Sequence, residues 1–126
     1  MTDKQAKSTA MIVDDSEVIR EILRDLLTLG GYSIIAEASD GVEAVTLYNK
    51  LKPDLIIMDV IMPRDDGLKA TKNIISQHKN AKIVMCSSIT DDSLILSAYD
   101  AGASGIIFKP FVAEQVLEVI NSVMQE

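Results

Sequence analysis

Short runs of β-branched and other apolar residues alternate along the chain with longer stretches in which apolar residues recur every three or four positions. The short runs predict five strands, at residues 9–13, 33–38, 54–58, 82–86 and 105–108. Each longer stretch predicts a helix, because its apolar residues fall on one helical face. Five strand–helix units with short connections build an α/β domain, a doubly wound parallel sheet with helices on both faces.

Polar residues, glycine and proline mark the ends of these helices. Side chains that can cap a helix N-terminus precede three of them: Asp14–Ser16, Asp40 with Glu43, and Thr90 or Asp91. Gly30 and Pro53 are stop signals for the first two helices. We expect the core face of the first helix to carry Ile19, Ile22, Leu23, Leu26 and Leu27.

The third run, residues 54–58, is continuously apolar, which is typical of a central strand covered on both faces. At 126 residues and 48% hydrophobic content, the chain suits one compact domain with a real core. We assign residues 9–126 to this domain and residues 1–8, which are polar, to a flexible N-terminal tail. Because the last predicted helix runs to the end of the sequence, we expect no attached output domain.

The net charge of -7 disfavours direct binding to nucleic acid, whose phosphates an acidic surface repels. No apolar run approaches the roughly 20 residues that cross a bilayer, and the N-terminus lacks a signal-peptide core. We therefore expect a soluble cytoplasmic protein without a membrane partner. The single Cys86 is interpreted as a small buried hydrophobe, and His78 as a surface residue.

Polar side chains stand where four of the predicted strands end. The first strand is followed by Asp14 and Asp15, the third by Asp59, the fourth by Ser87 and the fifth by Lys109. In open α/β sheets, ligands bind at the carboxyl ends of the strands. Each of these residues alone is open to a simpler reading as a helix cap, a turn former or a surface charge. Their joint placement favours a site.

Three carboxylates gathered at one edge repel one another unless one binds a proton or a cation lies among them. Mg²⁺ prefers oxygen ligands and keeps free positions for other oxygens. A carboxylate can itself attack phosphorus, and phosphoryl transfer mainly needs positioning and charge neutralisation. Asp59 is then the candidate nucleophile, with Lys109 as a second positive charge and Ser87 as a hydroxyl donor.

Four motifs carry a resemblance to a known family: IVDDS at 12–16, LIIMDVIMPRDDG at 55–67, VMCSS at 84–88 and GASGIIFKPF at 102–111. In this order and spacing they resemble the response-regulator receiver family, over residues 9–124. The single-domain regulators of the chemotaxis CheY type are the most similar members. The resemblance implies a flavodoxin-like sheet with strand order 2-1-3-4-5.

The resemblance also implies a role for each matching residue. Asp59 would be the phosphoacceptor, and Ser87 and Lys109 would hold the phosphoryl group. The ligands of Mg²⁺ (or Mn²⁺) would be Asp15 and Asp59 directly, Asp14 through water, and the backbone carbonyl of Ile61. The Lys109–Pro110 bond would be cis. Such a protein is a switch rather than an enzyme, because it catalyses only its own phosphorylation and dephosphorylation.

The implied partners are a histidine kinase of the CheA type and a downstream motor, adaptor or phosphotransfer protein, with a phosphatase as a further partner and the chain itself a monomer. Ile106 departs from the family, which often has Tyr or Phe at this position. We predict a partner surface at Ile95, Tyr99, Ile106 and Val112. Ile61 and Ile89 are apolar and orient no water, so we hypothesise slow self-dephosphorylation.

Three other readings remain. A phosphorelay intermediate would use the same chemistry and pass the phosphoryl group to a histidine phosphotransfer protein. A phosphatase of the haloacid dehalogenase type would need a second Asp at position 61, where this chain has Ile. A flavodoxin-like cofactor binder would need a phosphate-cradling first loop, where Asp14 and Asp15 would repel the phosphate.

Overall fold

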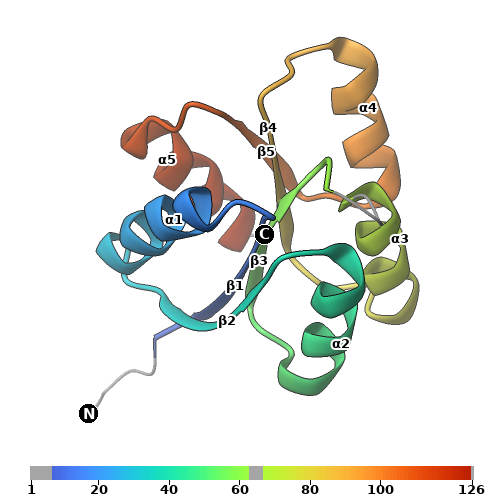
Figure 1. Cartoon of the computed structure of the whole chain (residues 1–126), viewed down its shortest axis with the longest axis horizontal. Helices are drawn as coiled ribbons and strands as arrows, with labels where there is room; N and C mark the ends of the chain where they lie inside the picture. The colour runs from blue at the N-terminus through green and yellow to red at the C-terminus, as the bar shows by residue number, and fades with distance from the viewer. Residues whose placement is uncertain (1–6, 63–66, 126) are drawn as a thin grey trace.

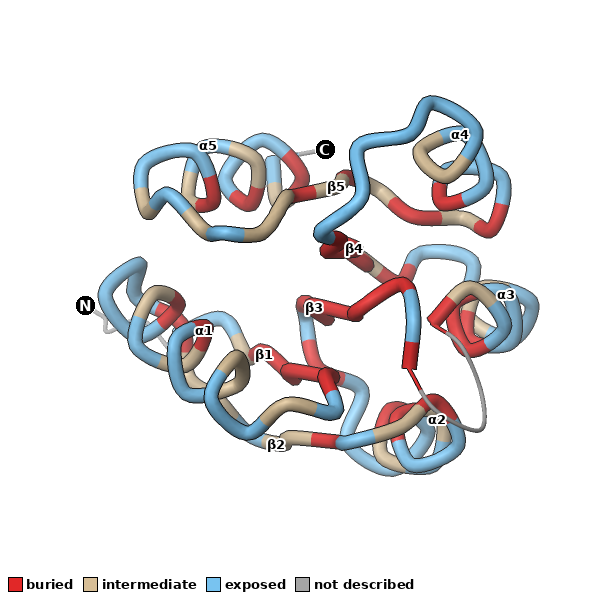
Figure 2. The backbone as a smooth tube through the Cα atoms, turned by 45° about the horizontal axis from the view of Figure 1, so that its top comes forward, coloured by how far each residue is buried: buried red, intermediate tan, exposed pale blue. Residues whose placement is uncertain are grey.

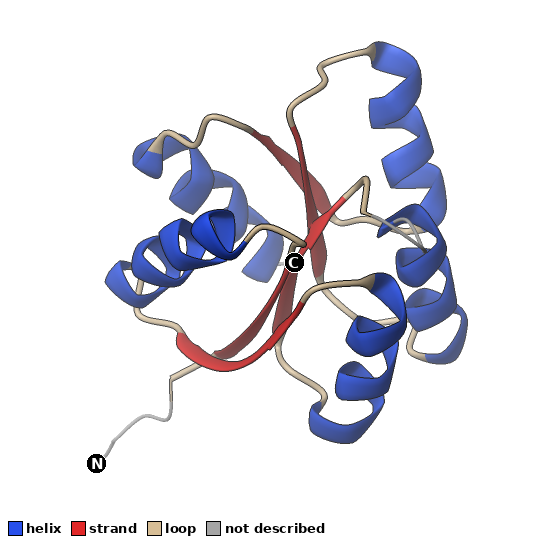
Figure 3. Cartoon of the chain, in the orientation of Figure 1, coloured by secondary structure: helices blue, strands red, loops and turns tan. Residues whose placement is uncertain are grey.

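A computed structural model of the chain describes residues 7–62 and 67–125, and this part forms five strands and five helices in strict alternation (Figure 3). The strands are β1 (Thr9–Val13), β2 (Ser33–Ala38), β3 (Leu55–Asp59), β4 (Ile83–Ser87) and β5 (Gly105–Phe108). The helices are α1 (Glu17–Leu29), α2 (Gly41–Leu51), α3 (Gly67–Gln77), α4 (Asp92–Ala101) and α5 (Ala113–Met124). None of these helices is long and apolar enough to cross a membrane.

All strands pair in parallel in one sheet of order β2-β1-β3-β4-β5, so the expected flavodoxin-like topology is confirmed. Helices α1 and α5 cover one face of the sheet, and α2, α3 and α4 cover the other (Figure 1). Alternate strand residues point to opposite faces, so the core consists of two layers. The layer under α1 and α5 contains Ile12 and Ile57, and the layer under α2 to α4 contains Met11 and Met58.

The continuously apolar third run is the central strand, as predicted, and every residue of β3 is buried (Figure 2). A strand covered by helices on both faces needs apolar side chains at every position. The core is aliphatic, apart from Tyr32, Tyr48 and the buried Cys86. The interpretation of Cys86 as a buried hydrophobe is therefore confirmed.

The helix caps agree with the sequence, with one refinement. The Ser16 hydroxyl accepts from the Ile19 amide at 3.2 Å and begins α1. Asp40 accepts from the Glu43 amide at 2.8 Å, and the Glu43 carboxylate accepts from the amide of Ser39 at 2.9 Å. For α4 the cap is Asp91 rather than Thr90.

The Asp91 carboxylate accepts from the amide and the hydroxyl of Ser93, at 3.0 Å and 3.1 Å. The helix therefore begins one residue after it, at Asp92. An aspartate is a better N-terminal cap than a threonine, because its carboxylate can accept both bonds at once and carries the charge that the helix dipole favours.

Four expectations about local structure need correction. Strands β3 and β4 begin and end one residue later than predicted, because the ladder pairs Asp59 with Cys86 and Ser87 with Phe108. Ile22 is 41% exposed although it was placed on the core face of α1. The face of α1 that contacts the sheet is narrower than its apolar stripe.

Gly67 begins α3 instead of ending the preceding loop. Pro63, which was expected in that loop, lies outside the described residues. Of the predicted N-terminal tail, residues 1–6 also lie outside the described part of the chain. Ser8 is exposed, and its carbonyl accepts a hydrogen bond from the Ser33 amide at 2.9 Å, so the segment joins the sheet just before β1.

Candidate functional site

The carboxyl edge of the sheet brings together polar residues from four strands. Asp14 follows β1, Asp59 and Ser87 end β3 and β4, and Lys109 follows β5. Asp14, Asp59 and Ser87 are buried, with 1%, 6% and 3% of their surfaces exposed. Buried polar groups are costly unless they are paired, so such a cluster at a ligand-binding edge indicates a functional site.

Lys109 links two carboxylates that are far apart in the sequence. Its Nζ lies 3.1 Å from Asp14 Oδ2 and 3.4 Å from Asp59 Oδ2. The other Asp14 oxygen, Oδ1, accepts from the Ser16 amide at 2.9 Å. The backbone of Lys109 is held by its amide, which donates to the Ser87 carbonyl at 2.8 Å. One ammonium therefore serves two carboxylates, and the cluster keeps an excess of negative charge.

Burial and the neighbouring negative charge both raise the pKa of Asp59. Burial, followed by the charge of Asp14, raises the pKa of Asp59 from its ordinary value to about 6, against the lowering effect of Lys109 and of the Ile61 amide. Burial alone would lower the pKa of Lys109, but the hydrogen bond to Asp14 and the charge of Asp59 raise it, so the ammonium stays charged. A second cation would relieve the remaining repulsion.

The donor atoms at this edge fit a hard divalent cation. Carboxylate oxygens of Asp14 and Asp59 and the Sγ of Cys86 all lie within 4.8 Å of one another. Burial raises the pKa of the Cys86 thiol far above its ordinary value, so the sulfur stays protonated and is a poor ligand. The carboxylates remain as donors, and oxygen is what Mg²⁺ prefers.

This geometry does not test the predicted ligation of the cation by the Asp15 carboxylate or by the Ile61 carbonyl. Asp15 is exposed and is not part of the group of close donor atoms found among the described residues. The backbone amide of Ile61 donates to the Asp59 carboxylate, and its side chain is 58% exposed. Ligation by the Asp15 carboxylate and by the Ile61 carbonyl stays a prediction.

Ser87 is engaged with its own loop in this structure. Its hydroxyl donates to the Ile89 carbonyl at 3.1 Å and accepts from the Ile89 amide at 2.9 Å. To donate to a phosphoryl oxygen, the hydroxyl must give up the bond to the Ile89 carbonyl. The predicted role of Ser87 therefore involves movement of the loop between β4 and α4.

Residues of the predicted partner surface differ in exposure. Tyr99 and Val112 are 46% and 48% exposed, whereas Ile95 and Ile106 are half-buried. Ile106 packs against the core layer under α2 to α4. A cavity of about 360 Å³ lies between β5 and α5 and is lined in part by Ile106, Val112 and Val119.

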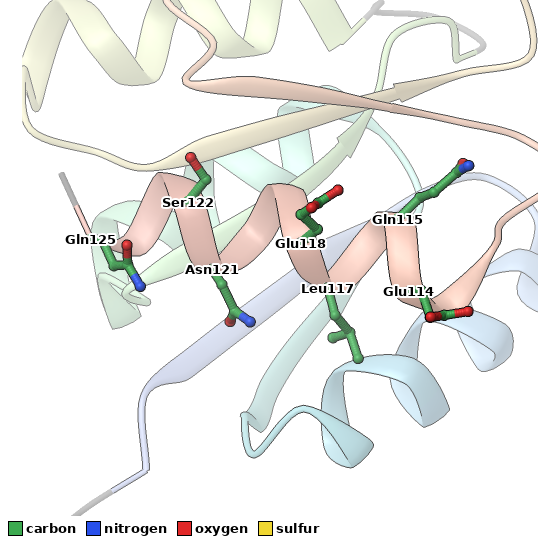
Figure 4. A pocket seen from close by; sticks show the side chains of 7 residues that line it. All are labelled: Glu114, Gln115, Leu117, Glu118, Asn121, Ser122 and Gln125. Carbon is green, nitrogen blue, oxygen red and sulfur yellow. The ribbon is translucent and has the colours of Figure 1, made fainter.

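A second pocket, of about 720 Å³, lies on the outer surface of α5 (Figure 4). Its described lining residues belong to that helix, apart from the C-cap Gln125, and include Glu114, Leu117, Glu118 and Asn121. None of the clustered residues of the carboxyl edge lines it, so we do not assign it to the site.

Two residues outside the predicted site were only partly anticipated. His78 is half-buried rather than a plain surface residue, because Nε2 lies 2.9 Å from Asn49 Oδ1 and the ring packs edge-on against Tyr48. It lies away from the acidic cluster, as expected. The closeness of Cys86 to the carboxylates was missed, since it depends on the register of β4 against β3.

The fold and the site together define a class of protein. It is a doubly wound α/β domain that carries buried carboxylates and a lysine at the carboxyl edge of its sheet. The Lys109–Pro110 bond is cis, as the resemblance implied. The model of the response regulator receiver domain matches residues 10–121, and the chain belongs to this family.

Known proteins agree with this assignment over most of the chain. The chain is 42% identical over 113 residues to the chemotaxis protein CheY of Thermotoga maritima, covering 90% of this chain and 94% of that protein. It is 41% identical over 114 residues to CheY of Bacillus subtilis, covering 90% and 95%. A chain in the crystal structure of the CheX–CheY–BeF₃–Mg²⁺ complex from Borrelia burgdorferi superposes with a TM-score of 0.89 at 34% identity, covering 92% of this chain and 88% of that one.

Proposed function

We propose that this chain is a phosphorylation switch in which Asp59 accepts a phosphoryl group with the help of Mg²⁺. The observation that carries the proposal is that one ammonium contacts both carboxylates at the carboxyl edge. Lys109 Nζ lies 3.1 Å from Asp14 Oδ2 and 3.4 Å from Asp59 Oδ2. The proposal is supported by two buried carboxylates that share one ammonium and so keep a net negative charge. Phosphoryl transfer needs little more than such positioning and charge balance.

In the transfer, a carboxylate oxygen of Asp59 attacks the phosphorus of a phosphohistidine. The new O–P bond forms as the P–N bond breaks, and the leaving imidazole keeps the bonding electron pair. Lys109 stays beside the phosphoryl oxygens and balances their charge, since its raised pKa keeps it protonated. A bound Mg²⁺ would supply further charge neutralisation, and Asp14, Asp15, Asp59 and the Ile61 carbonyl would hold it.

The proposed pathway is chemotaxis, with a histidine kinase as donor and a motor or adaptor protein as target. Support comes from the CheY proteins to which the chain is similar over about nine tenths of its length. One matching structure contains CheY in a complex with CheX, which supports a further protein partner for this chain. A phosphorelay role remains the alternative, because it uses the same site.

The proposed output surface contains Ile95, Tyr99, Ile106 and Val112, on α4, β5 and the start of α5. If the Ser87 hydroxyl turned to a phosphoryl oxygen, its hydrogen bond to the Ile89 carbonyl would break, and the loop that leads into α4 would move. Ile106 has no hydroxyl, so this surface would change by packing and not by a new hydrogen bond. The cavity beside Ile106 leaves room for such repacking.

The chemistry is tested by incubating the protein with acetyl phosphate and Mg²⁺ and measuring the acyl phosphate by intact-protein mass spectrometry. We expect labelling of the wild type, none of Asp59→Asn, and wild-type labelling of Asp54→Asn, since Asp54 lies at the other end of β3. Labelling of Asp59→Asn, or labelling that persists without any divalent cation, would overturn the acceptor assignment.

The pathway is tested separately by binding. The phosphorylated protein is titrated with a flagellar or archaellar motor component and with a histidine phosphotransfer domain. Tighter binding to the motor component than to the transfer domain supports the chemotaxis role. Rapid transfer of the phosphoryl group to the transfer domain supports the phosphorelay alternative instead.

A further inference from the structure

Three charged residues beside the site bridge α1 and β2. Arg20 Nε lies 3.1 Å from Glu37 Oε1, and Arg24 Nε lies 2.7 Å from Glu37 Oε2, so the two guanidinium groups share one carboxylate. The Arg20 and Glu37 side chains are mostly buried, with 17% and 26% of their surfaces exposed. The hydrogen bond from Arg24, and then that from Arg20, lowers the pKa of Glu37, so this carboxylate stays ionised.

Of the two arginines, Arg20 also contacts the loop after β1, which carries Asp14 and Asp15. Arg20 Nη1 donates to the backbone carbonyl of Asp14 at 2.7 Å. The Asp14 amide donates to the Ala38 carbonyl at 3.1 Å, next to Glu37 on β2. The two Asp14 carboxylate oxygens accept from Ser16 and Lys109. Every hydrogen-bonding atom of Asp14 therefore has a partner, and Arg20 is the partner of its carbonyl.

The carbonyl of Asp14 and the amide of Asp15 belong to the same planar peptide unit. A donor that fixes the carbonyl therefore fixes the plane from which Asp15 continues. A short charge-assisted bond is suited to this task, because the guanidinium is rigid and is itself held by Glu37 through a second nitrogen. Arg20 therefore influences the orientation of both Asp14 and Asp15 without itself being a ligand of the cation.

We propose that Arg20 is a positioning residue of the cation site, oriented by Glu37, and that it holds the Asp14–Asp15 peptide in the geometry that binds Mg²⁺. This inference rests on the proposed function, because it presupposes that the acidic cluster binds the cation. Groups that orient metal ligands typically contribute about 10- to 100-fold to metal affinity. Arg24 also pairs with Glu37 but makes no hydrogen bond to Asp14 in the described part of the chain, so Arg24→Ala is a matched control.

Loss of charge and loss of positioning have opposite effects on cation affinity, and the variants Arg20→Ala and Arg24→Ala separate the two. Arg20→Ala and Arg24→Ala each remove one positive charge near an acidic cluster, and loss of a repelling charge by itself strengthens cation binding. Loss of the fixed Asp14 carbonyl weakens binding, and only Arg20→Ala causes it. A drop in affinity in Arg20→Ala therefore reports positioning and not charge.

The experiment measures Mg²⁺ binding by isothermal titration calorimetry, and Mn²⁺ binding by the paramagnetic resonance signal of the free ion. We expect Arg20→Ala to bind about 10-fold to 100-fold more weakly than the wild type. Arg24→Ala should bind within about 2-fold of the wild type or more tightly. Arg20→Lys keeps a donor for the Asp14 carbonyl and should recover part of the loss. Thermal unfolding without metal checks that all variants are folded.

The outcomes separate the two proposals. If the wild type binds neither ion, the proposed function fails, whatever the arginine variants do. If the wild type binds and Arg20→Ala binds equally well, the positioning role of Arg20 is wrong. If Arg24→Ala is weakened as much as Arg20→Ala, the network only ties α1 to β2, and the role of the Asp14 carbonyl is likewise overturned.

Discussion

Asp54 and Asp59 lie at the two ends of β3, and their carboxylates have different surroundings. Asp54 is exposed, and its Oδ2 accepts from the Thr9 amide at 2.8 Å and from the Thr9 hydroxyl at 3.1 Å. Asp59 is buried beside a second carboxylate, and its pKa is raised to about 6. Neutral donors stabilise the first carboxylate and tie β1 to β3. The second is held at a cost in stability.

Two glycines show the same difference between the edges. Gly31 lies between α1 and β2 with a φ of +92°, and a Cβ there would meet nothing within 4 Å. Gly67 begins α3, and a Cβ there would overlap the backbone carbonyl of Asp59. At the amino edge the chain only has to turn. At the carboxyl edge it has to pass close to the backbone of Asp59, the candidate phosphoacceptor, and only a residue without a Cβ leaves room for this.

The largest effect is expected from Gly67→Ala. The new methyl group must displace α3 or the end of β3, so we expect a loss of about 3 kcal/mol in the free energy of unfolding, measured by urea denaturation. Gly31→Ala is the control and should cost about 1 kcal/mol, because only its positive φ is unfavourable for alanine. Equal costs for the two variants would contradict the contrast between the edges.

Lys109→Met should reduce the rate of acyl phosphate formation about 100-fold, because it removes the fixed charge beside the phosphoryl oxygens. The measurement is the initial rate with acetyl phosphate and Mg²⁺. Lys50→Met, on the exposed last turn of α2, removes the same charge far from the site and should leave the rate unchanged. A Lys109→Met rate within about 3-fold of the wild type would show that the ammonium is not used.

Asp59→Asn should stabilise the protein at pH 7 by about 2 kcal/mol when no divalent cation is present. The folded-state pKa of Asp59, about 6, is above its ordinary value, so the folded protein binds this proton more tightly than the unfolded chain. Wild-type stability is therefore lost relative to the variant as the pH rises from about 4 to about 6. Below about pH 4 the two proteins should be equally stable.

The control for this prediction is Asp54→Ala, which should change the free energy of unfolding in the opposite direction. It removes the acceptor of two hydrogen bonds from Thr9 and should destabilise the protein by about 1 kcal/mol at pH 7. Urea denaturation at several pH values measures both variants. A stability difference between Asp59→Asn and wild type that does not change with pH would argue against the raised pKa.

The smallest effect is expected from polar substitutions at Ile61 and Ile89, which are 58% and 44% exposed. Ile61→Asn and Ile89→Gln introduce groups that can orient an attacking water, so the phosphorylated form should decay about 3- to 10-fold faster. Val42→Gln, at an equally exposed site on α2, is the control. A wild-type lifetime of seconds, unchanged in both variants, would rule out the proposed slow self-dephosphorylation.

Much of the fold and the membership of the site could be predicted from local patterns. The apolar period separates strands from helices, and the run from Leu55 to Met58 marks the central strand. Because parallel strands end at the same edge, Asp14, Asp59, Ser87 and Lys109 could be assigned to one place before any distance was known. The contacts of Lys109 with Asp14, Asp59 and the Ser87 carbonyl confirm that these residues are gathered there.

Other features escaped because they depend on lateral register and on side-chain reach. Cys86 lies beside the carboxylates because β4 pairs it with Asp59. The contact of Arg20 with the Asp14 carbonyl depends on how α1 packs against β2. The exposure of Ile22 depends on how wide a face of α1 the sheet can cover. Periodicity within one segment carries no information on any of these.

The amino-acid sequence by itself determined the order of elements, the two-layered core and the residues delivered to the carboxyl edge, since these follow from local hydrophobic period and chain direction. Only the tertiary structure decided that Lys109 pairs with both Asp59 and Asp14, the latter 95 residues away in the sequence, and that the Asp14 carbonyl is held by Arg20. Charge coupling falls with distance in space, and that distance is set by packing. Asp54 precedes β3 and Asp59 ends it; they are the same residue type, and only their neighbours in space make one structural and the other a candidate phosphoacceptor.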